Sequence, residues 1–272
     1  NGTGILITPS DGSFNSASEN GYSYIPLITV NALSNGNHTI SIHAKDAVGN
    51  WGPFTTATLT IDRTPPTVGI PTLTPSASNN TAVAISATAN DTATGNSNIG
   101  GGEYFIDTAG AAGTGAAMTA TAALPNTTIT ANIPAAAIGA LTTGNHTIYV
   151  RAKDAAGNWS TTTSATLLID RTAPTFTGIS ISPNSISVGT PSVTLTVNGA
   201  SDAGGSGVAG GEYWFGSTDI TAGTGTAFTG TSGISVATGS LTPGTYTLRV
   251  RIRDGAGNWS TGTGGVRTTT LT

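Results

Sequence analysis

One nine-residue phrase appears three times in this chain of 272 residues and constrains its fold more than any other feature. The phrase reads His/Arg-x-Lys/Arg-Asp-x-x-Gly-Asn-Trp and begins at residues 43, 151 and 251. Its aspartates, Asp46, Asp154 and Asp254, are 108 and 100 residues apart (154 − 46 and 254 − 154). That spacing is the length of one small β-sandwich domain, so the chain is predicted to be an array of similar domains.

Two other anchors recur in the same register. Gly-Gly-Glu-Tyr begins at 101 and 210, and Asp-Arg-Thr-x-Pro begins at 62 and 170. Proline cannot donate a ladder hydrogen bond and keeps the residue before it extended, so each Asp-Arg-Thr-x-Pro segment is interpreted as a short, semi-rigid linker. The predicted domains are 1–63, 64–171 and 172–272.

Alternation of apolar and polar residues predicts strands. Before the second phrase, Ile148, Val150 and Ala152 point one way and their neighbours the other. Each complete repeat holds about seven such short segments between Gly, Pro, Asn and Ser turns, the pattern of an antiparallel β-sandwich. The Ala-rich stretch 127–141 is not expected to form a helix, because it contains Pro134 and lacks charge.

The phrase itself is interpreted as a hairpin turn. An aspartate at its fourth position can accept turn N–H groups, and the glycine supplies a positive φ. Trp51, Trp159 and Trp259 then open the returning strand as rigid packing residues. A repeated fold needs the same turn each time, so repetition alone does not favour a catalytic reading of the aspartates.

The segment Leu241–Val250 resembles the corner before strand F of fibronectin type III domains, where a tyrosine hydroxyl caps nearby backbone; here that residue is Tyr246. His146 and His38 stand at the matching places, so those copies depart from the pattern. The whole chain resembles the Ig-like tandem repeats of large bacterial and archaeal surface proteins, whose repeats end in Lys-Asp-x-x-Gly-Asn-Trp, a strand and Asp-x-Thr-x-Pro. This resemblance implies an all-β fold of tandem immunoglobulin-like (fibronectin III-like) antiparallel β-sandwiches. Such repeats serve as stalks, adhesins, filaments and enzyme spacers, so it is specific for architecture only.

The first repeat is incomplete. Its phrase begins about 40 residues into the chain, with no Gly-Gly-Glu-Tyr before it, and Gly2-Thr3-Gly4 matches Gly-Thr-Gly at 113–115 and 223–225. About three strands are therefore missing, which would expose an apolar face and open edges. Either the sequence is a segment of a longer repeat protein, or strands of a neighbouring subunit complete the half-domain.

Composition excludes several classes of function. Only 8% of residues are charged, the net charge is −4, and no Lys/Arg cluster marks a nucleic-acid partner. No run of 18 apolar residues is present, so no membrane span is expected in this segment. The absence of cysteine, the single methionine and the two lysines fit an extracellular protein of a prokaryotic cell surface. No histidine stands in a loop with Ser and Asp partners, so the chain is not expected to be an enzyme.

Metal binding is predicted at the junctions between repeats. In an Ig-like sandwich the B–C and F–G loops share a pole with the incoming linker, which would gather acids able to supply oxygens to structural calcium. The first set is Asp62, Asp91, Glu103 and Asp154; the second is Asp170, Asp202, Glu212 and Asp254. Alternatively, Arg63 and Arg171 pair with the neighbouring linker acids. No other cofactor is expected.

Two further surface features are candidate sites. Asn90 and Asn126 begin Asn-x-Thr sequons and are candidates for glycosylation. In the third repeat an aromatic side chain and three basic ones are expected to face outward on adjacent strands, as a carbohydrate-stacking or cation–π patch. These residues are Trp214, Arg249, Arg251 and Arg253. The alternative is a cross-strand ladder closed by Glu212.

The leading hypothesis is a structural protein of a prokaryotic cell surface, a rod-like array forming a stalk, sheath or self-assembling filament whose partner is a second copy of itself. The alternative is an adhesin or carbohydrate-binding spacer module of a larger secreted protein, with surface glycans as partners.

Overall fold

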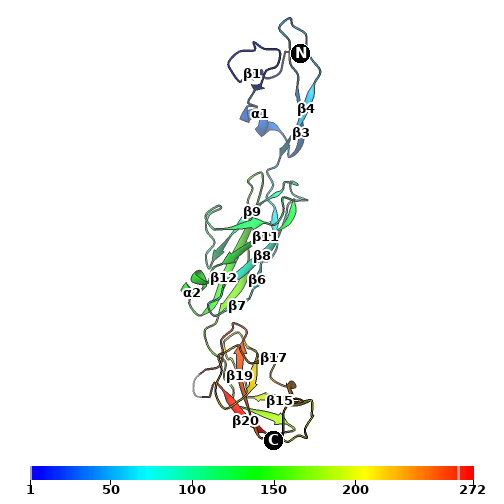
Figure 1. The fold of residues 1–272 in the computed structure, drawn as a ribbon. Helices are drawn as coiled ribbons and strands as arrows, with labels where there is room; N and C mark the ends of the chain where they lie inside the picture. The colour runs from blue at the N-terminus through cyan, green and yellow to red at the C-terminus, as the bar shows by residue number, and fades with distance from the viewer. Residues whose placement is uncertain (1, 262–263) are drawn as a thin grey trace.

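The computed structural model describes residues 2–261 and 264–272, which form three bodies following one another along an elongated molecule (Figure 1). Strands dominate all three, and the two helices are one and a half turns long. The predicted all-β fold is confirmed. The domain boundaries stay a prediction, although the two hydrophobic clusters lie within 64–171 and 172–272.

The second body (residues 64–171) is a complete sandwich. Its chain order is β5 (Thr67–Val68), β6 (Thr72–Thr74), β7 (Ala77–Ser78), β8 (Val83–Asn90), β9 (Ile99–Ile106), β10 (Ala116–Ala120), β11 (Asn126–Ile133), α2 (Ala135–Ala140), β12 (Gly144–Asp154) and β13 (Thr163–Ile169). The strands pair in the order β5-β8-β11-β10-β9-β12-β13-β7, with β6 also on β8. Because β10 pairs with both β11 and β9, it joins the two layers at one side.

The third body (residues 172–272) repeats this plan in two separate sheets. Its strands are β14 (Gly178–Ser182), β15 (Ser192–Asn198), β16 (Val208–Phe215), β17 (Thr226–Thr229), β18 (Ile234–Ala237), β19 (Tyr246–Asp254) and β20 (Arg267–Leu271). One sheet has the order β14-β15-β18 and the other β17-β16-β19-β20. Both cores follow the predicted alternation: Ile148, Val150 and Ala152 are fully buried, as are Leu248, Val250 and Ile252.

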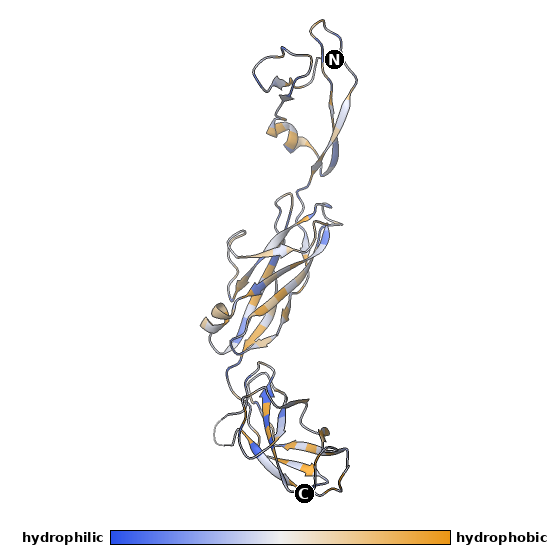
Figure 2. Cartoon of the chain, in the orientation of Figure 1, coloured by the Kyte–Doolittle hydropathy of each residue, from blue (hydrophilic) through white to orange (hydrophobic). Residues whose placement is uncertain are grey.

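The first body contains only the later part of this plan. Hairpin β1 (Thr8–Pro9)–β2 (Gly21–Tyr22) and helix α1 (Leu27–Ala32) precede hairpin β3 (Gly36–Ile42)–β4 (Thr55–Ile61). β3 corresponds to β12, yet among the described residues only β4 pairs with it. Several apolar side chains are therefore exposed, among them Leu6, Leu27 and Ile28 at 80%, 71% and 81%. Figure 2 shows the apolar character of α1.

The expectation that residues 127–141 avoid a helix was wrong, because α2 occupies Ala135–Ala140. Pro134 is the residue before the first helical one, where its missing N–H removes no helix hydrogen bond. Ile138 is fully buried in the sandwich core, and this tertiary packing stabilises a segment too short to be helical alone.

The turn interpretation of the repeated phrase is confirmed. The Asp154 carboxylate accepts hydrogen bonds from the N–H groups of Gly157 and Asn158 at 2.7 and 2.8 Å. Gly157 has φ +103°, a conformation that side-chain-bearing residues rarely adopt, and the glycines of the other two copies have φ +101° and +98°.

The corner before the penultimate strand is also present in all three repeats. Tyr246 donates its hydroxyl to the Thr242 carbonyl at 2.9 Å, as the fibronectin resemblance implies. His146 and His38 differ in residue type, yet each places Nε2 2.8 Å from the carbonyl oxygen four residues earlier. A carbonyl oxygen only accepts, so Nε2 carries the proton and histidine makes the same bond as tyrosine.

No helix in the described part of the chain has the length and apolar character needed to cross a membrane.

Candidate functional site

The linkers make the most specific polar contacts between repeats. At the second junction, Asp170 follows β13 of the second repeat but bonds to the third. Its Oδ2 accepts from the backbone N–H and the hydroxyl of Ser206, both at 2.8 Å. Its backbone carbonyl accepts from the Asn258 side-chain amide at 2.9 Å. Asp170 is 1% exposed, so these bonds lie away from solvent.

The first junction repeats these contacts. The Ser97 hydroxyl donates to the Asp62 carboxylate, and the Asn158 side-chain amide donates to the Asp62 carbonyl at 3.2 Å. Asn158 also donates to Asp154 at 2.9 Å. The asparagine of the repeated phrase therefore both closes its own turn and holds the incoming linker. The sequence pattern indicated a turn residue and did not indicate its contact with the linker. The only sequence signal for that contact was that each linker is followed by a repeat carrying this asparagine.

The linker arginines bond to the repeat that precedes them. Arg171 donates from Nη1 to the Leu141 carbonyl at 2.9 Å and from Nη2 to the Ile138 carbonyl at 3.0 Å, at the end of α2. Arg63 makes the same pair of bonds at the end of α1, at 2.9 and 3.0 Å. The alternative pairing of these arginines with the adjacent acids was wrong, because the guanidinium groups point back to helix-end carbonyls. Each Asp-Arg dipeptide thus joins two repeats with adjacent side chains.

Each junction also gathers three aspartates. Carboxylate oxygens lie within 4.8 Å of one another in two clusters, Asp62, Asp91 and Asp154 at the first junction and Asp170, Asp202 and Asp254 at the second. Four of the six carboxylates are nearly inaccessible; these are Asp91, Asp154, Asp170 and Asp254, at 0–1% exposure. Six of the eight predicted metal ligands are therefore brought together.

The second cluster is electrostatically unbalanced at Asp202. Burial raises the pKa of Asp202, and the negative charges of Asp170 and Asp254 raise it further. Its Oδ1 atom is buried and lacks a hydrogen-bond partner among the described residues. Gly205 is required beside it, because a Cβ there would lie 2.6 Å from the Asp202 carboxylate. The cluster thus contains a buried carboxylate oxygen, Oδ1 of Asp202, that accepts no hydrogen bond from the described protein groups.

Glu103 and Glu212 do not join these clusters, so their assignment as junction ligands was wrong. Each lies mid-strand on the outer face of its sheet, where a loop folds over it. Glu212 accepts from the N–H groups of Gly223 and Gly225 at 3.0 and 2.6 Å, and its Oε1 lies 2.7 Å from Nε of Arg251. Glu103 is bound in the same way by the earlier Gly-Thr-Gly segment. Burial raises the pKa of Glu103, but these backbone bonds and the neighbouring arginine outweigh it and hold the pKa below its usual value.

The predicted ligand patch of the third repeat is only partly exposed. Arg253 is exposed and Arg249 is half-buried, but the exposure of Trp214 and Arg251 was predicted wrongly. Trp214 and Arg251 are only 8% and 6% exposed. The loop 216–225 lies over them: Trp214 donates to the Thr218 carbonyl at 3.0 Å, and Arg249 donates to the Gly216 carbonyl at 2.9 Å. The Arg251 guanidinium stacks 4.7 Å from the Trp214 ring, and Arg253 lies 5.5 Å from another tryptophan ring of the repeat. The cation–π contacts exist, but the Trp214 ring is buried beneath the loop and the Arg251 guanidinium.

The two sequons differ in accessibility. Asn126 is exposed at the start of β11. Asn90, at the end of β8, is half-buried, and its side-chain oxygen accepts from the N–H and hydroxyl of Thr92 at 2.9 and 2.7 Å. Of the two, Asn126 is the accessible candidate for glycosylation.

Comparison with known proteins agrees with this architecture. Residues 23–99 match the family model described as bacterial Ig-like domain (group 3), a segment that straddles the first linker. Over this segment the chain is similar to bacterial Ig-like domains, and its second and third bodies have the strand arrangement of Ig-like sandwiches. Among solved structures, the fibronectin(III)-like modules of Clostridium thermocellum CbhA align with 75% of this chain and 93% of theirs, at 14% identity and a TM-score of 0.38.

Two bacterial glucanases contain segments similar to this chain. Endoglucanase B of Cellulomonas fimi is 35% identical over 166 residues, covering 58% of this chain and 14% of the glucanase. Exoglucanase B of the same species is 30% identical over 243 residues, covering 86% of this chain and 20% of the glucanase. The chain thus spans a fifth or less of the length of these relatives. Ig-like and fibronectin III-like domains are generally non-catalytic.

Proposed function

We propose that this array is a non-catalytic structural rod of a prokaryotic extracellular protein, holding other parts of that protein, or the cell surface, at a fixed separation. The observation that carries the proposal is the repeated junction. At both linkers the aspartate bonds to the following repeat and the arginine to the preceding one. Paired bonds on both sides restrict rotation about a linker that proline already keeps extended. The glucanase relatives support a spacer role within a larger protein.

Inter-repeat distance distributions test this function directly. The chain has no cysteine, so a pair of spin labels can be placed at the exposed positions Ala84 and Thr268 of the full chain. We expect a narrow distance distribution that broadens in the double variant Ser206→Ala, Asn258→Ala, because both side-chain donors to Asp170 are lost. The matched control is Ser97→Ala, Asn158→Ala, which alters the other junction and leaves this distance narrow. A broad distribution in the unaltered chain would refute the rod.

Self-assembly into a filament, stalk or sheath is a finer form of this proposal. The open edge of β3 and the exposed apolar residues of the first repeat support it, because a soluble half-sandwich exposes surface that added strands would bury. Strands of a second copy, and preceding strands of the same polypeptide, are the two candidates to cover this face.

Calcium binding at the junctions is a second candidate function. The three clustered carboxylates at each junction and the unsatisfied, buried Oδ1 of Asp202 favour it. Calcium takes six to eight oxygen ligands, which carboxylates and loop carbonyls supply. A cation there would remove the repulsion that raises the pKa of Asp202.

Melting with and without calcium tests this second function. We expect calcium to raise the melting temperature of the unaltered chain and to have less effect on Asp202→Asn. The matched control is Asp219→Asn on an exposed loop of the same repeat, which keeps the full calcium response. A melt that neither calcium nor a chelator changes would eliminate this function and leave the rod proposal untouched.

A further inference from the structure

The bonds made by the two linker arginines define a recurrent socket. In the second repeat the Arg171 guanidinium donates hydrogen bonds to the backbone carbonyls of Ile138, Leu141 and Asn79, at 2.9–3.1 Å. The Leu141 N–H also donates to the Ile138 carbonyl at 3.1 Å, which sets the turn that presents both oxygens. The first repeat presents the same pair of oxygens to Arg63.

The third repeat builds the same socket. The Leu241 N–H donates to the Thr238 carbonyl at 2.9 Å, as Leu141 does to Ile138, and the Tyr246 corner follows as the His146 corner does. The backbone beside this turn also corresponds in its course. The Thr272 N–H donates to the Asn184 carbonyl as the Leu168 N–H donates to Ser76, and three residues further along lie Ser187 and Asn79. The Ser187 carbonyl differs from that of Asn79, because it already accepts from the N–H and hydroxyl of Thr190 at 3.1 and 2.8 Å.

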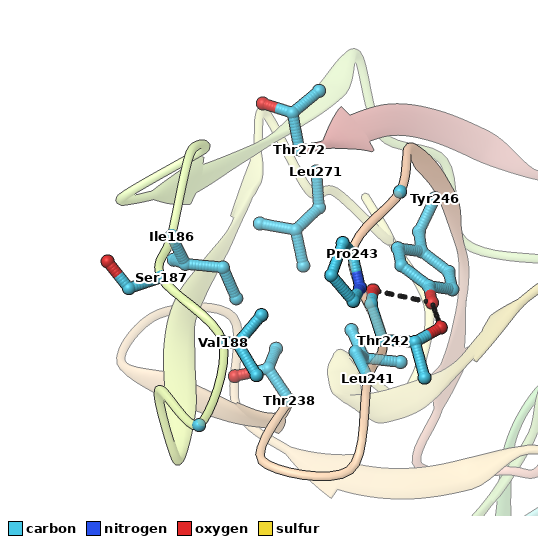
Figure 3. A pocket seen from close by; sticks show the side chains of 12 residues that line it. Ile186, Ser187, Val188, Thr238, Leu241, Thr242, Pro243, Tyr246, Leu271 and Thr272 are labelled. Carbon is cyan, nitrogen blue, oxygen red and sulfur yellow. Dashed lines mark hydrogen bonds between the residues drawn. The ribbon is translucent and has the colours of Figure 1, made fainter.

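A pocket of about 220 Å³ lies at this place in the third repeat (Figure 3). Thr238, Leu241 and Ser187 line it, together with apolar side chains that include Ile186, Val188 and Leu271. Figure 3 shows the Leu241 and Val188 side chains on facing walls, with the Leu271 side chain pointing in between them and Thr272 beyond it. The pocket thus has apolar walls for a side-chain stem, and it is lined by Thr238 and Leu241, the equivalents of the two residues whose carbonyls bind Arg171.

We propose that this pocket is a guanidinium site that receives the arginine of a further Asp-Arg linker running on from β20. This inference rests on the proposed function and deepens it, because it identifies where and how the third repeat joins another repeat. Leu271 and Leu167 are the equivalent buried residues of β20 and β13, so a chain continuing beyond Thr272 as the second repeat does beyond Leu168 brings an arginine to the pocket. Arginine suits the site because its planar fork reaches several carbonyls at once, whereas lysine is a single point charge.

The test extends the full chain by six residues that copy Ile169–Pro174, placed directly after Thr272. We expect amide exchange at Leu241 to slow by about tenfold, since hydrogen bonds from a charged donor stabilise this turn. The matched control is the same extension with glutamine in place of its arginine, which is expected to give little protection. Equal protection by both extensions, or none by the arginine extension, would overturn the proposal.

Two further arms separate this inference from the proposed function. Arg171→Gln is the internal reference and is expected to speed amide exchange at Leu141. If it does so while the arginine extension leaves Leu241 unchanged, the pocket proposal fails and the rod function stands. If Arg171→Gln leaves Leu141 protection and the inter-repeat distance unchanged, the junction argument itself fails.

The free six-residue peptide is expected to protect Leu241 far less than the attached one at equal concentration. Equal protection would contradict an occupant carried by a continuing strand.

Discussion

At the scale of single residues, buried polar side chains hold loops and corners in place. His146 is 7% exposed, with Nε2 on the Thr142 carbonyl and Nδ1 2.8 Å from the Asp107 carboxylate. Burial lowers the pKa of His146, but the bonds to Asp107 and Thr142 outweigh it, and the net pKa is raised. The corner is thus strongest when the imidazole is protonated and Asp107 is ionised.

This pair predicts a pH dependence confined to the second repeat. A histidine whose folded-state pKa is raised contributes stability below its unfolded pKa, near 6.5, and that contribution is lost as pH rises through the folded value. We expect the second repeat to lose stability as the pH rises above about 6.5. His146→Gln should abolish this slope. The measurement is amide exchange at Ile148 across the pH series, corrected for intrinsic rates; a slope that survives in the variant would contradict the assignment.

The buried carboxylate of the third repeat gives a second prediction at this scale. Glu212→Ala leaves Arg251 charged and nearly inaccessible, which is expected to cost about 3–5 kcal/mol of unfolding free energy in that repeat. Asp219→Ala is the control, because the Asp219 side chain is 59% exposed and 3.4 Å from the same guanidinium, and its loss should cost about 0–1 kcal/mol. Denaturant unfolding followed at the amide of Val250 compares the two variants. Equal losses of unfolding free energy would contradict a stabilising role for the buried Glu212–Arg251 pair.

At the scale of elements, equivalent strands differ in what covers them. β12 lies between β9 and β13, and its inward residues are fully buried. β3 has a similar sequence pattern, but among the described residues it pairs only with β4, and its inward residue Ile40 is half-exposed. Similar local sequence therefore contributes different amounts of stability, because buried area sets the hydrophobic gain.

Matched truncations test this difference between the two strands. Ile148→Ala is expected to destabilise the second repeat by about 2–5 kcal/mol, through lost apolar burial and a residual cavity. Ile40→Ala, at the equivalent place in β3, should destabilise the first repeat by less than about 1 kcal/mol. Amide exchange within each hairpin measures both effects. A large loss for Ile40→Ala would indicate that other strands already cover that face in solution.

At the scale of the whole molecule, the two ends of the array differ. The N-terminal body presents exposed apolar residues and an unpaired strand edge, whereas the C-terminal body presents the arginine pocket. The junctions between them are alike, so the proposed rod has a repeating middle, and its two ends are the candidate sites of association.

The open N-terminal body predicts association that depends on its apolar side chains. We expect the chain to form fibres or oligomers by electron microscopy and sedimentation at micromolar concentration. The double variant Leu27→Ser, Ile28→Ser should reduce association, since both residues are more than two-thirds exposed. Ile70→Ser, an exposed apolar change in the second repeat, is the control. Isolated rods at micromolar concentration would rule out self-assembly and leave preceding strands of the same polypeptide as the cover of this face.

By itself the sequence determined the repeat, the alternating strands and the turn chemistry, because each depends on residues close together in the chain. Local spacing places Asp154 three residues before the turn glycine and Ile148 two residues before Val150. Only the tertiary structure decided which acids meet. The alternation of residues predicted that Glu103 lies on the outer face of its strand. The structure shows that a folded loop covers this face, and that backbone amides and an arginine bind the carboxylate away from the junction. The direction of Arg171 and the cover over Trp214 likewise depend on loops that fold back from distant positions, and local pattern carries no information about such contacts.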